Sequence, residues 1–356
     1  MANSTESLIS KLLEVTIKEQ ASDLHLSTNH PPVLRLSGRL IPLLKYKILT
    51  REDLDGITKA LLSEGQIQRF QQEKEIDFSY NFEDKGRFRV NVFFQQGEIS
   101  CALRLIPTKI KTIEELSLPP ILHEWTKANQ GFVLITGPSS QGKSTTLAAL
   151  IDEINHTRTE HIITIEDPIE YLFQDDRSLV EQREVFQDTL SFARALRSTF
   201  RQDPNVIMVG EMRDPETIST AITAAETGHL VFTTLHTNSA AQSIHRIVDI
   251  FPPEQQGQVR AQLSGSLLGI FSQRLVPCIK GGLIPAGEVL LNTVAVANQI
   301  RENKIHEIPL VIETSGDVGM ISLNRSLSDL VKRREITLEN ALNYSLNPSE
   351  LKMLIR

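Results

Sequence analysis

The chain has 356 residues, of which 40% are hydrophobic and 23% charged, and this composition fits a globular protein of roughly two domains. With 37 basic and 44 acidic residues its formal net charge is -7, which argues against bulk nucleic-acid binding, and its two cysteines exclude a disulfide framework and a four-cysteine zinc site. No apolar run approaches the roughly 18 residues of a membrane span, so we expect a protein of the reducing cytoplasm.

Residues 1–106 are predicted to form a small α+β domain. An N-terminal helix is expected because Leu8, Leu12 and Leu13 follow helical spacing, and the acids among them argue against a secretory signal. A longer helical stretch is predicted at residues 51–73. Extended segments are predicted at residues 24–27, 33–36, 76–80, 87–94 and 99–105, with turns at 29–32 and 85–86. Residues 107–120 begin and end with proline, which indicates an interdomain linker.

Residues 121–356 have the pattern of an α/β domain. Short apolar runs rich in β-branched residues alternate with helical segments at 143–154 and 189–200. The runs lie at residues 131–136, 161–166, 206–211 and 230–236. Continuous apolar strands in this alternation predict a parallel sheet covered on both faces. From about residue 254 the chain is predicted to be mostly helical, at 254–274, 295–302, 320–333 and 338–344.

The strongest motif follows the first of these strands and opens a helix. It matches the phosphate-loop pattern G-x-x-x-x-G-K-[ST] and consists of Gly137, Pro138, Ser139, Ser140, Gln141, Gly142, Lys143 and Ser144. Backbone N–H groups of such a loop and the positive end of the helix bind phosphate oxygens. We therefore predict that these residues and Thr145 bind ATP. Lys143 is expected to reach the outer phosphates, and the Ser144 hydroxyl to ligate Mg²⁺.

Charged groups stand at the ends of three other predicted strands. Glu211 ends the run 206–211 in the layout of a Walker B acid and is predicted to hold the Mg²⁺ shell, directly or through water. Glu166 ends the run 161–166 and is predicted to polarise the attacking water, whereas Glu170 is left open to a purely structural role. His229 and His236 stand on either side of the run 230–235, so one of them is expected to sense the terminal phosphate.

In combination these motifs resemble the secretion-ATPase superfamily and, more narrowly, the PilT-type retraction ATPases of bacterial type IV pili. The resemblance begins at ASDLHLS (21–27) and continues through DFSY, GRFRVNVF and ALRLIP (102–107). It is carried further by GPSSQGKSTTLAALID, TIEDPIEYLFQ, ALRSTFRQDPNVIMVGEMRDPETI and TAAETGHLVFTTLHTNSAAQSIHRIVDIFPPEQQ. It therefore covers nearly the whole chain.

The resemblance implies a homohexameric ring of two-domain subunits, with a PAS-like N-terminal domain, a RecA-like ATPase domain and ATP bound between them. It assigns Glu166 to the Asp box as catalytic base, Glu211 to Walker B, and His229 and His236 to the His box. It also implies that the ring works at the cytoplasmic face of the inner membrane. There it would act on a platform protein of the pilus machinery and be peripheral to the membrane through its partners.

The family also implies that arginines from the N-terminal domain reach the nucleotide, and Arg87, Arg89 and Arg104 match that pattern. Arginine suits this role because it stabilises charge that develops on the transferred phosphoryl group. The roles of Arg194, Arg197 and Arg213 are left open between the site, salt bridges and subunit contacts.

The chain departs from the family pattern in three places. Many relatives have glycine at position 140 and a small residue at 141, so a side chain at Ser140 is expected to be unfavourable if its φ is positive. The AHEIM-like segment is Ala286-Gly-Glu-Val-Leu290, without the histidine, and the AIRNLIR-like segment 295–301 lacks its first arginine. In the family these two segments are tied to retraction rather than to hydrolysis.

Three alternatives to a retraction motor stay open. Extension and secretion ATPases commonly carry a long extra N-terminal region, and many carry a four-cysteine zinc module. This chain starts directly at the small domain and has two cysteines, which favours retraction. The altered phosphate loop is the only support for a low-turnover accessory subunit. A nucleic-acid motor shares the RecA-like architecture but is disfavoured by the acidic composition.

Overall fold

A computed structural model describes residues 2–36, 38–83, 85–106 and 109–355. The chain divides into two compact units, of which the first comprises Met1–Lys109 with Asp167–Leu172 and the second Ile110–Glu166 with Phe173–Arg356. The predicted linker begins at Pro107 and Thr108, which lie outside the described residues. Each unit has its own sheet and its own hydrophobic core.

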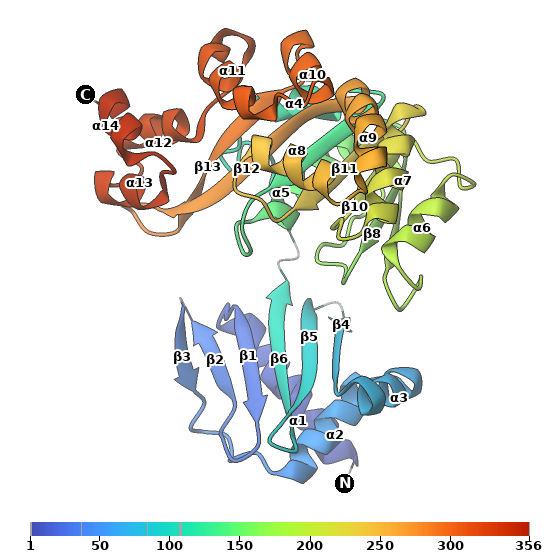
Figure 1. The fold of residues 1–356 in the computed structure, drawn as a ribbon. Coiled ribbons are helices and arrows are strands. Elements are labelled where there is room, and N and C mark those ends of the chain that lie inside the picture. The colour runs from blue at the N-terminus through green and yellow to red at the C-terminus, as the bar shows by residue number, and fades with distance from the viewer. Residues whose placement is uncertain (1, 37, 84, 107–108, 356) are drawn as a thin grey trace. The chain divides into compact units, whose positions relative to one another are not determined.

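The first unit is an antiparallel sheet with the strand order β3-β2-β1-β6-β5-β4 and helices packed against it (Figure 1). Its elements are α1 (Ala2–Lys18), β1 (Asp23–Ser27), β2 (Val33–Leu36), β3 (Arg39–Pro42), α2 (Arg51–Leu61), α3 (Glu64–Glu73), β4 (Glu75–Phe82), β5 (Gly86–Gln95) and β6 (Glu98–Ile106). The five predicted strands are present. The predicted turn at 85–86 is wrong at Gly86, which already pairs with Phe82 in the β-ladder. β3 was not predicted, because its four residues are all exposed and show no alternation of apolar and polar residues.

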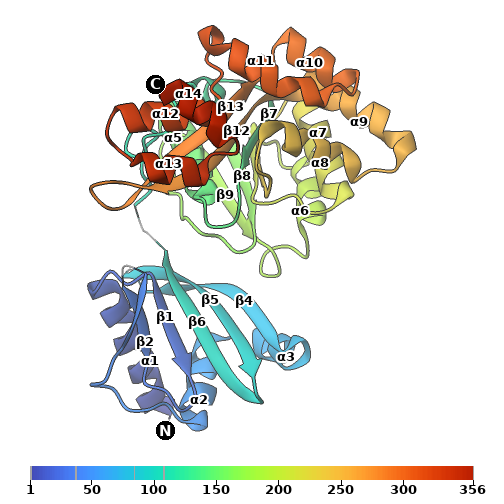
Figure 2. The same cartoon turned by 60° about the vertical axis from the view of Figure 1, so that its left-hand side comes forward.

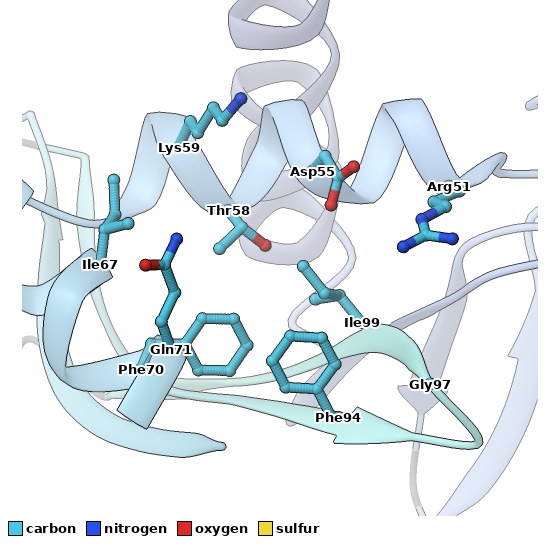
Figure 3. A pocket seen from close by; sticks show the side chains of 10 residues that line it. All are labelled: Arg51, Asp55, Thr58, Lys59, Ile67, Phe70, Gln71, Phe94, Gly97 and Ile99. Carbon is cyan, nitrogen blue, oxygen red and sulfur yellow. The ribbon is translucent and has the colours of Figure 1, made fainter. Parts of the chain in front are cut away.

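The predicted helical stretch 51–73 is two helices. The Ser63 side chain accepts a hydrogen bond from the Gln66 N–H, and the Gln66 side chain bonds back to the Ser63 N–H. This capping box starts a new helix and so ends the old one. Between α2, α3 and the β5–β6 hairpin lies a cavity of about 180 Å³, floored by the stacked rings of Phe70 and Phe94 with Thr58 and Ile99 beside them (Figure 3).

The second unit is built on a seven-stranded sheet with the order β13-β12-β7-β11-β10-β8-β9, in which the paired strands run parallel except for β13 (Figure 2). Its strands are β7 (Gly131–Thr136), β8 (His161–Glu166), β9 (Leu179–Glu184), β10 (Val206–Val209), β11 (Leu230–Leu235), β12 (Leu267–Pro277) and β13 (Leu283–Leu291). Its α-helices are α4 (Leu122–Thr126), α5 (Lys143–Thr157), α6 (Phe192–Thr199), α7 (Pro215–Glu226), α8 (Ala240–Asp249), α9 (Pro253–Ser266), α10 (Val294–Arg301), α11 (Ile308–Thr314), α12 (Leu323–Lys332), α13 (Leu338–Tyr344) and α14 (Pro348–Ile355).

The central strands are buried on both faces, as their continuous apolar runs predict. In β7, Phe132 and Leu134 belong to the core shared with α7, α8 and α9, whereas Val133 and Ile135 belong to the core shared with α4 and α5. Alternate residues thus face opposite helical layers. Helices cover both faces of the sheet, and α5, which begins at the phosphate loop, lies in one of these layers.

The prediction of a helix over 254–274 is wrong beyond Ser266. Residues 267–277 form β12, which pairs in parallel with β7 and antiparallel with β13. An apolar run buried between two neighbours has the same composition as a buried helix, so periodicity alone does not distinguish the two. The C-terminal part therefore extends the sheet by a hairpin before the terminal helices begin.

Gly287 in β13 explains one departure from the family pattern. A Cβ atom at this position would lie 2.3 Å from the Phe271 ring and 2.9 Å from the carbonyl oxygen of Ser272. The ring of Phe271 on the neighbouring strand β12 therefore occupies the space that a side chain at position 287 would need.

Replacement of Gly287 by alanine is expected to lower the free energy of unfolding by about 1–3 kcal/mol, because the Phe271 ring must shift within a packed core. The midpoint of urea unfolding of the nucleotide-free protein measures this. Gly65→Ala in α3 is the matched control, since beyond its chain neighbours and its own helix backbone no atom lies within 4 Å of the added Cβ. Equal midpoints for the parent and Gly287→Ala would contradict the packing argument.

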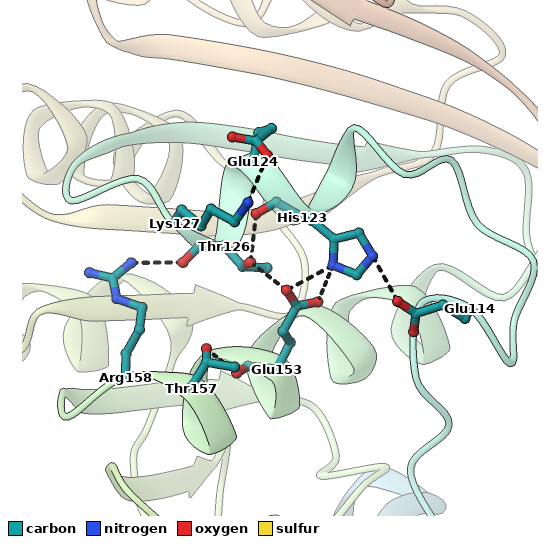
Figure 4. Close-up of polar contacts among 8 residues, drawn as sticks. All are labelled: Glu114, His123, Glu124, Thr126, Lys127, Glu153, Thr157 and Arg158. Atoms are coloured by element: carbon teal, nitrogen blue, oxygen red, sulfur yellow. Dashed lines mark hydrogen bonds and ion pairs between the residues drawn. The ribbon is translucent and has the colours of Figure 1, made fainter.

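His123 ties the segment that follows the predicted linker to the phosphate-loop helix (Figure 4). Its Nδ1 lies 2.8 Å from a carboxylate oxygen of Glu153 on α5, and its Nε2 lies 3.0 Å from Glu114. The Thr126 hydroxyl also donates to Glu153, and Arg158 donates to the Thr126 carbonyl. The hydrogen bond to Glu153 and the charges of both carboxylates raise the pKa of His123 above its ordinary value, against the opposing effect of burial.

A raised pKa means that protonated His123 stabilises the fold below its ordinary pKa near 6.5, and that this contribution is lost as the pH rises through the raised value. We expect the free energy of unfolding of His123→Gln to lie below that of the parent at pH 6, and the difference between the two to be smaller at pH 9. Urea unfolding across this range measures the effect, and Glu153→Gln should flatten the same pH dependence. Parallel curves for the parent and His123→Gln would show that this pair does not titrate with folding.

Candidate nucleotide-binding and catalytic site

Four strand ends meet at one edge of the sheet in the second unit. β7, β8, β10 and β11 are parallel, so their carboxyl ends lie together, where ligands of open α/β sheets bind. The phosphate loop follows β7, Glu166 ends β8, Glu211 lies just beyond β10, and His236 follows β11 directly. Because β11 and β10 lie between β7 and β8, His236 and Glu211 stand between the loop and Glu166.

The loop adopts a backbone that glycine favours at three positions. The φ angles are 148° at Gly137, 61° at Ser140 and 79° at Gly142, and α5 begins at the next residue, Lys143. Sequence analysis predicted that a side chain at position 140 is unfavourable if φ is positive there, and φ is positive at Ser140. A non-glycine residue in this conformation costs about 1–2 kcal/mol. This loop therefore needs other contacts to hold its shape.

Lys143 is buried and folded back onto the loop. Its Nζ donates to the carbonyl oxygens of Gly137 at 2.9 Å and Pro138 at 2.8 Å, and it lies 3.4 Å from Nδ1 of His236. Ser139 Oγ is also 3.4 Å from that ring nitrogen. The ammonium is thus held at the mouth of the loop, within reach of any phosphate bound there.

Glu211 and His236 lie together beside Lys143. His236 Nε2 lies 3.5 Å from Glu211, and Arg213 donates to the other carboxylate oxygen at 2.7 Å. Burial acts to raise the pKa of Glu211, but Arg213, His236 and Lys143 together lower it, so Glu211 is ionised at neutral pH. Burial and the Lys143 charge lower the pKa of His236. The arrangement places a carboxylate and a histidine with lowered pKa next to the lysine of the phosphate loop.

Glu166 is buried at the end of β8, with its side chain held from two sides. The hydroxyl of Thr164 donates to Oε1 at 2.7 Å, and the amide of Gln182 on β9 donates to the same oxygen at 3.1 Å. Both bonds fix the carboxylate orientation, which a general base requires. Sequence reasoning missed Gln182 and Thr164. Thr164 lies two residues before the acid on the same face of β8, and this spacing was a usable signal.

Ser144 and Glu211 fit the requirements of Mg²⁺ in chemical type. Both supply oxygen ligands, and Mg²⁺ at phosphate sites takes few protein ligands, with waters and phosphate oxygens completing its octahedron. Over the described ranges, no three histidine, cysteine or acidic side chains gather as a self-sufficient metal site.

His229 is not brought to this group within one chain. It precedes β11, at the opposite edge of the sheet, where Nδ1 bonds the Ala224 carbonyl at 2.9 Å and the ring meets Phe200 edge-on. Six strand residues separate it from His236, a span of roughly 20 Å. Its assignment to the site stays a prediction.

The three predicted arginines are all engaged within the first unit. Arg87 donates to the Ile169 carbonyl and to Asn81. Arg89 pairs with Glu170, and Arg104 with Asp23. Of the arginines left open, Arg213 contacts Glu211, as described above, and Arg197 pairs with Glu216. That Arg87, Arg89 and Arg104 act on nucleotide stays a prediction.

Gln273 of β12 was missed, because the segment that carries it was predicted as helix. It is almost fully buried and contacts the phosphate loop and α5 through its amide group. No motif singled it out, since only the sheet topology brings it to the loop. None of the described helices combines the length and the apolar character that crossing a bilayer requires.

Comparison with known proteins finds relatives over most of the chain. Residues 2–309 match the family of type II/IV secretion system proteins. The type IV pilus retraction ATPase PilT of Pseudomonas aeruginosa is 45% identical over 337 residues, which cover 94% of this chain and 96% of PilT. A twitching motility protein of Neisseria gonorrhoeae is 44% identical over 321 residues, covering 90% of this chain and 86% of that protein.

A crystal structure of the pilus retraction motor PilT with bound ADP is also similar. Its TM-score is 0.90 at 46% sequence identity, and the match covers 97% of this chain and 99% of that one. The predicted resemblance and the predicted α/β fold class are therefore confirmed.

Proposed function

This chain belongs to the family of type II/IV secretion system proteins, and we propose that it is an ATPase motor that drives retraction of type IV pili. The observation that carries the proposal is the meeting of Lys143, His236 and Glu211 at the phosphate loop, with Glu166 at the same sheet edge. The similarity to PilT over most of both chains supports retraction over the other activities in this family.

In the proposed reaction, ATP binds with its phosphates on the loop amides. Lys143 exchanges its loop carbonyls for phosphate oxygens, which bind a charged ammonium more strongly than neutral carbonyls do. Glu166 accepts a proton from water as the water oxygen bonds to the terminal phosphorus and the bond from that phosphorus to the ADP oxygen breaks. Mg²⁺, held by Ser144 and Glu211, would supply charge neutralisation at the phosphates.

We further propose that the working form is a homohexameric ring at the cytoplasmic face of the inner membrane, where it acts on a platform protein of the pilus. Arg87, Arg89, Arg104 and His229 would then be available to nucleotide as the ring moves through its cycle. Cycles of ATP binding and hydrolysis would supply the mechanical work that returns pilin to the membrane.

Deletion of the gene in the native host tests the direction of the motor. Loss of retraction should leave cells hyperpiliated and unable to twitch, and the parent gene should restore both properties, whereas a Glu166→Gln gene should not. Cells without any pili would instead indicate an assembly ATPase. The mass of the purified protein with and without ATP tests the ring, and a monomer under both conditions would contradict it.

A further inference from the structure

β12 extends past the end of β7 and lies along the phosphate loop. The last pair between the two strands is Ser272 with Thr136, and β12 continues for five more residues while the chain after Thr136 turns into the loop. Where a strand continues beyond the end of its neighbour, its backbone N–H and C=O groups on that side need other hydrogen-bond partners. The loop is in contact with this edge, since a Cβ atom at Gly137 would lie 2.4 Å from the Gln273 carbonyl oxygen.

Gln141 provides one of these partners. Its Oε1 accepts a hydrogen bond from the backbone N–H of Leu275 at 2.7 Å. A small residue at position 141 has no atom that reaches this N–H. The long polar side chain, which departs from the family pattern, thus fastens the loop to the strand beside it.

Gln273 provides a second attachment through both ends of one amide. Its Nε2 donates to the main-chain oxygen of Gln141, and its Oε1 accepts from the Thr146 hydroxyl on α5 at 2.7 Å. The partners fix the orientation of the amide, because a flipped amide would place oxygen against oxygen at Gln141. One buried side chain therefore joins the loop, the helix that follows it and β12.

The bond to the Gln141 carbonyl also sets the direction of a phosphate-binding group. The peptide unit is planar and trans, so the Gln141 C=O and the Gly142 N–H point in opposite directions. With the oxygen bonded to Gln273, the Gly142 N–H points away from β12. Backbone N–H groups at this part of the motif cradle the phosphates.

We propose that Gln141 and Gln273 are positioning residues that hold the phosphate loop in its binding shape by anchoring it to β12. The anchoring offsets the cost of Ser140 in the left-handed region, with its φ of 61°. The proposal rests on the function proposed above, because it concerns the same nucleotide site. On this proposal, the affinity for nucleotide depends in part on the position of the β12–β13 hairpin.

The test uses near-isosteric variants of the full chain that lack the hydrogen-bonding groups: Gln141→Met, Gln273→Met and the double variant. Gln258→Met, on the exposed face of α9, is the matched control, and Lys143→Ala marks loss of the site itself. Equilibrium titration with fluorescent ADP and Mg²⁺ gives the dissociation constant of each, at a temperature where circular dichroism shows the variant to be folded. KM and kcat for ATP are measured alongside.

Each single variant should raise the dissociation constant for ADP about tenfold, as expected for a lost buried hydrogen bond, and should raise KM in proportion. The dissociation constant of the double variant should rise by much less than the product of the two single factors. Once one anchor is lost, the loop is already released, so losing the second anchor changes its affinity little. A purely structural role would lower stability without this non-additive change in affinity.

Two results would overturn the inference alone: single variants that bind ADP like the parent while Lys143→Ala does not, or factors that multiply in the double variant. A parent that binds ADP no better than Lys143→Ala would overturn the proposed function and the inference with it.

Discussion

Replacement of Glu166 by glutamine is expected to lower kcat for ATP hydrolysis by about 10²–10⁴-fold, the usual contribution of a general base. Glutamine has almost the same shape as glutamate and keeps an oxygen to accept from Thr164 and Gln182. The fold around the end of β8 should therefore survive, while the group that takes the proton from water is lost. Steady-state hydrolysis by the purified protein measures the change.

Nucleotide binding separates this effect from damage to the site. Glu166→Gln should bind ADP as the parent does, because the phosphate loop is unchanged. Glu181→Gln removes a carboxylate from the neighbouring strand β9, where the side chain is 56% exposed and pairs with His161, and should hydrolyse ATP at the parent rate. Parent-like kcat in Glu166→Gln would remove Glu166 from the proposed mechanism and direct attention to Glu211.

Replacement of Lys143 by alanine is expected to weaken ADP binding by about 100-fold, or about 2.7 kcal/mol, in line with the loss of a charge-assisted bond to phosphate. In the structure the ammonium bonds two carbonyls at the start of the loop, Gly137 and Pro138, so the measured loss is that of the phosphate bond less the cost of releasing these carbonyls. Titration with fluorescent ADP measures the effect.

Lys352→Ala, on the exposed side of α14, is the control for loss of one positive charge and should bind as the parent does. If Lys143→Ala retained both the parent affinity and the parent rate of hydrolysis, the phosphate-loop assignment would be untenable. Retained affinity with lost hydrolysis would instead show that Lys143 acts mainly in the transition state.

The segment of β13 that departs from the family pattern at Gly287 contacts the start of α8. Glu288, beside Gly287, is in β13, and its carboxylate accepts a hydrogen bond from the N–H of Ala240 at the start of α8 at 2.8 Å. Burial raises the pKa of Glu288, and the bond to Ala240 opposes that rise. Through this contact the β12–β13 hairpin reaches the segment that follows His236. The same hairpin anchors the phosphate loop, so it contacts two parts of the proposed site.

The sequence by itself determined the chemistry of the phosphate loop and the order of the elements around it. The motif from Gly137 to Ser144 requires a strand before it and a helix after it, and both are present as β7 and α5. The acids Glu166 and Glu211 could be predicted as site residues because parallel strands buried on both faces appear as continuous apolar runs, each with a charged residue at its end. These signals are local, so a single sequence suffices to read them.

Only the tertiary structure decided which of these groups meet. His229 and His236 are equivalent in the sequence, one at each end of an apolar run. The parallel sheet sends one to the phosphate edge and the other to the opposite edge. The strand β12 and its Gln273 were hidden for the same physical reason. A segment buried between two strands shows no periodicity of its own, and its partners Gln141 and Thr146 lie more than a hundred residues earlier in the chain, where no local pattern can indicate them.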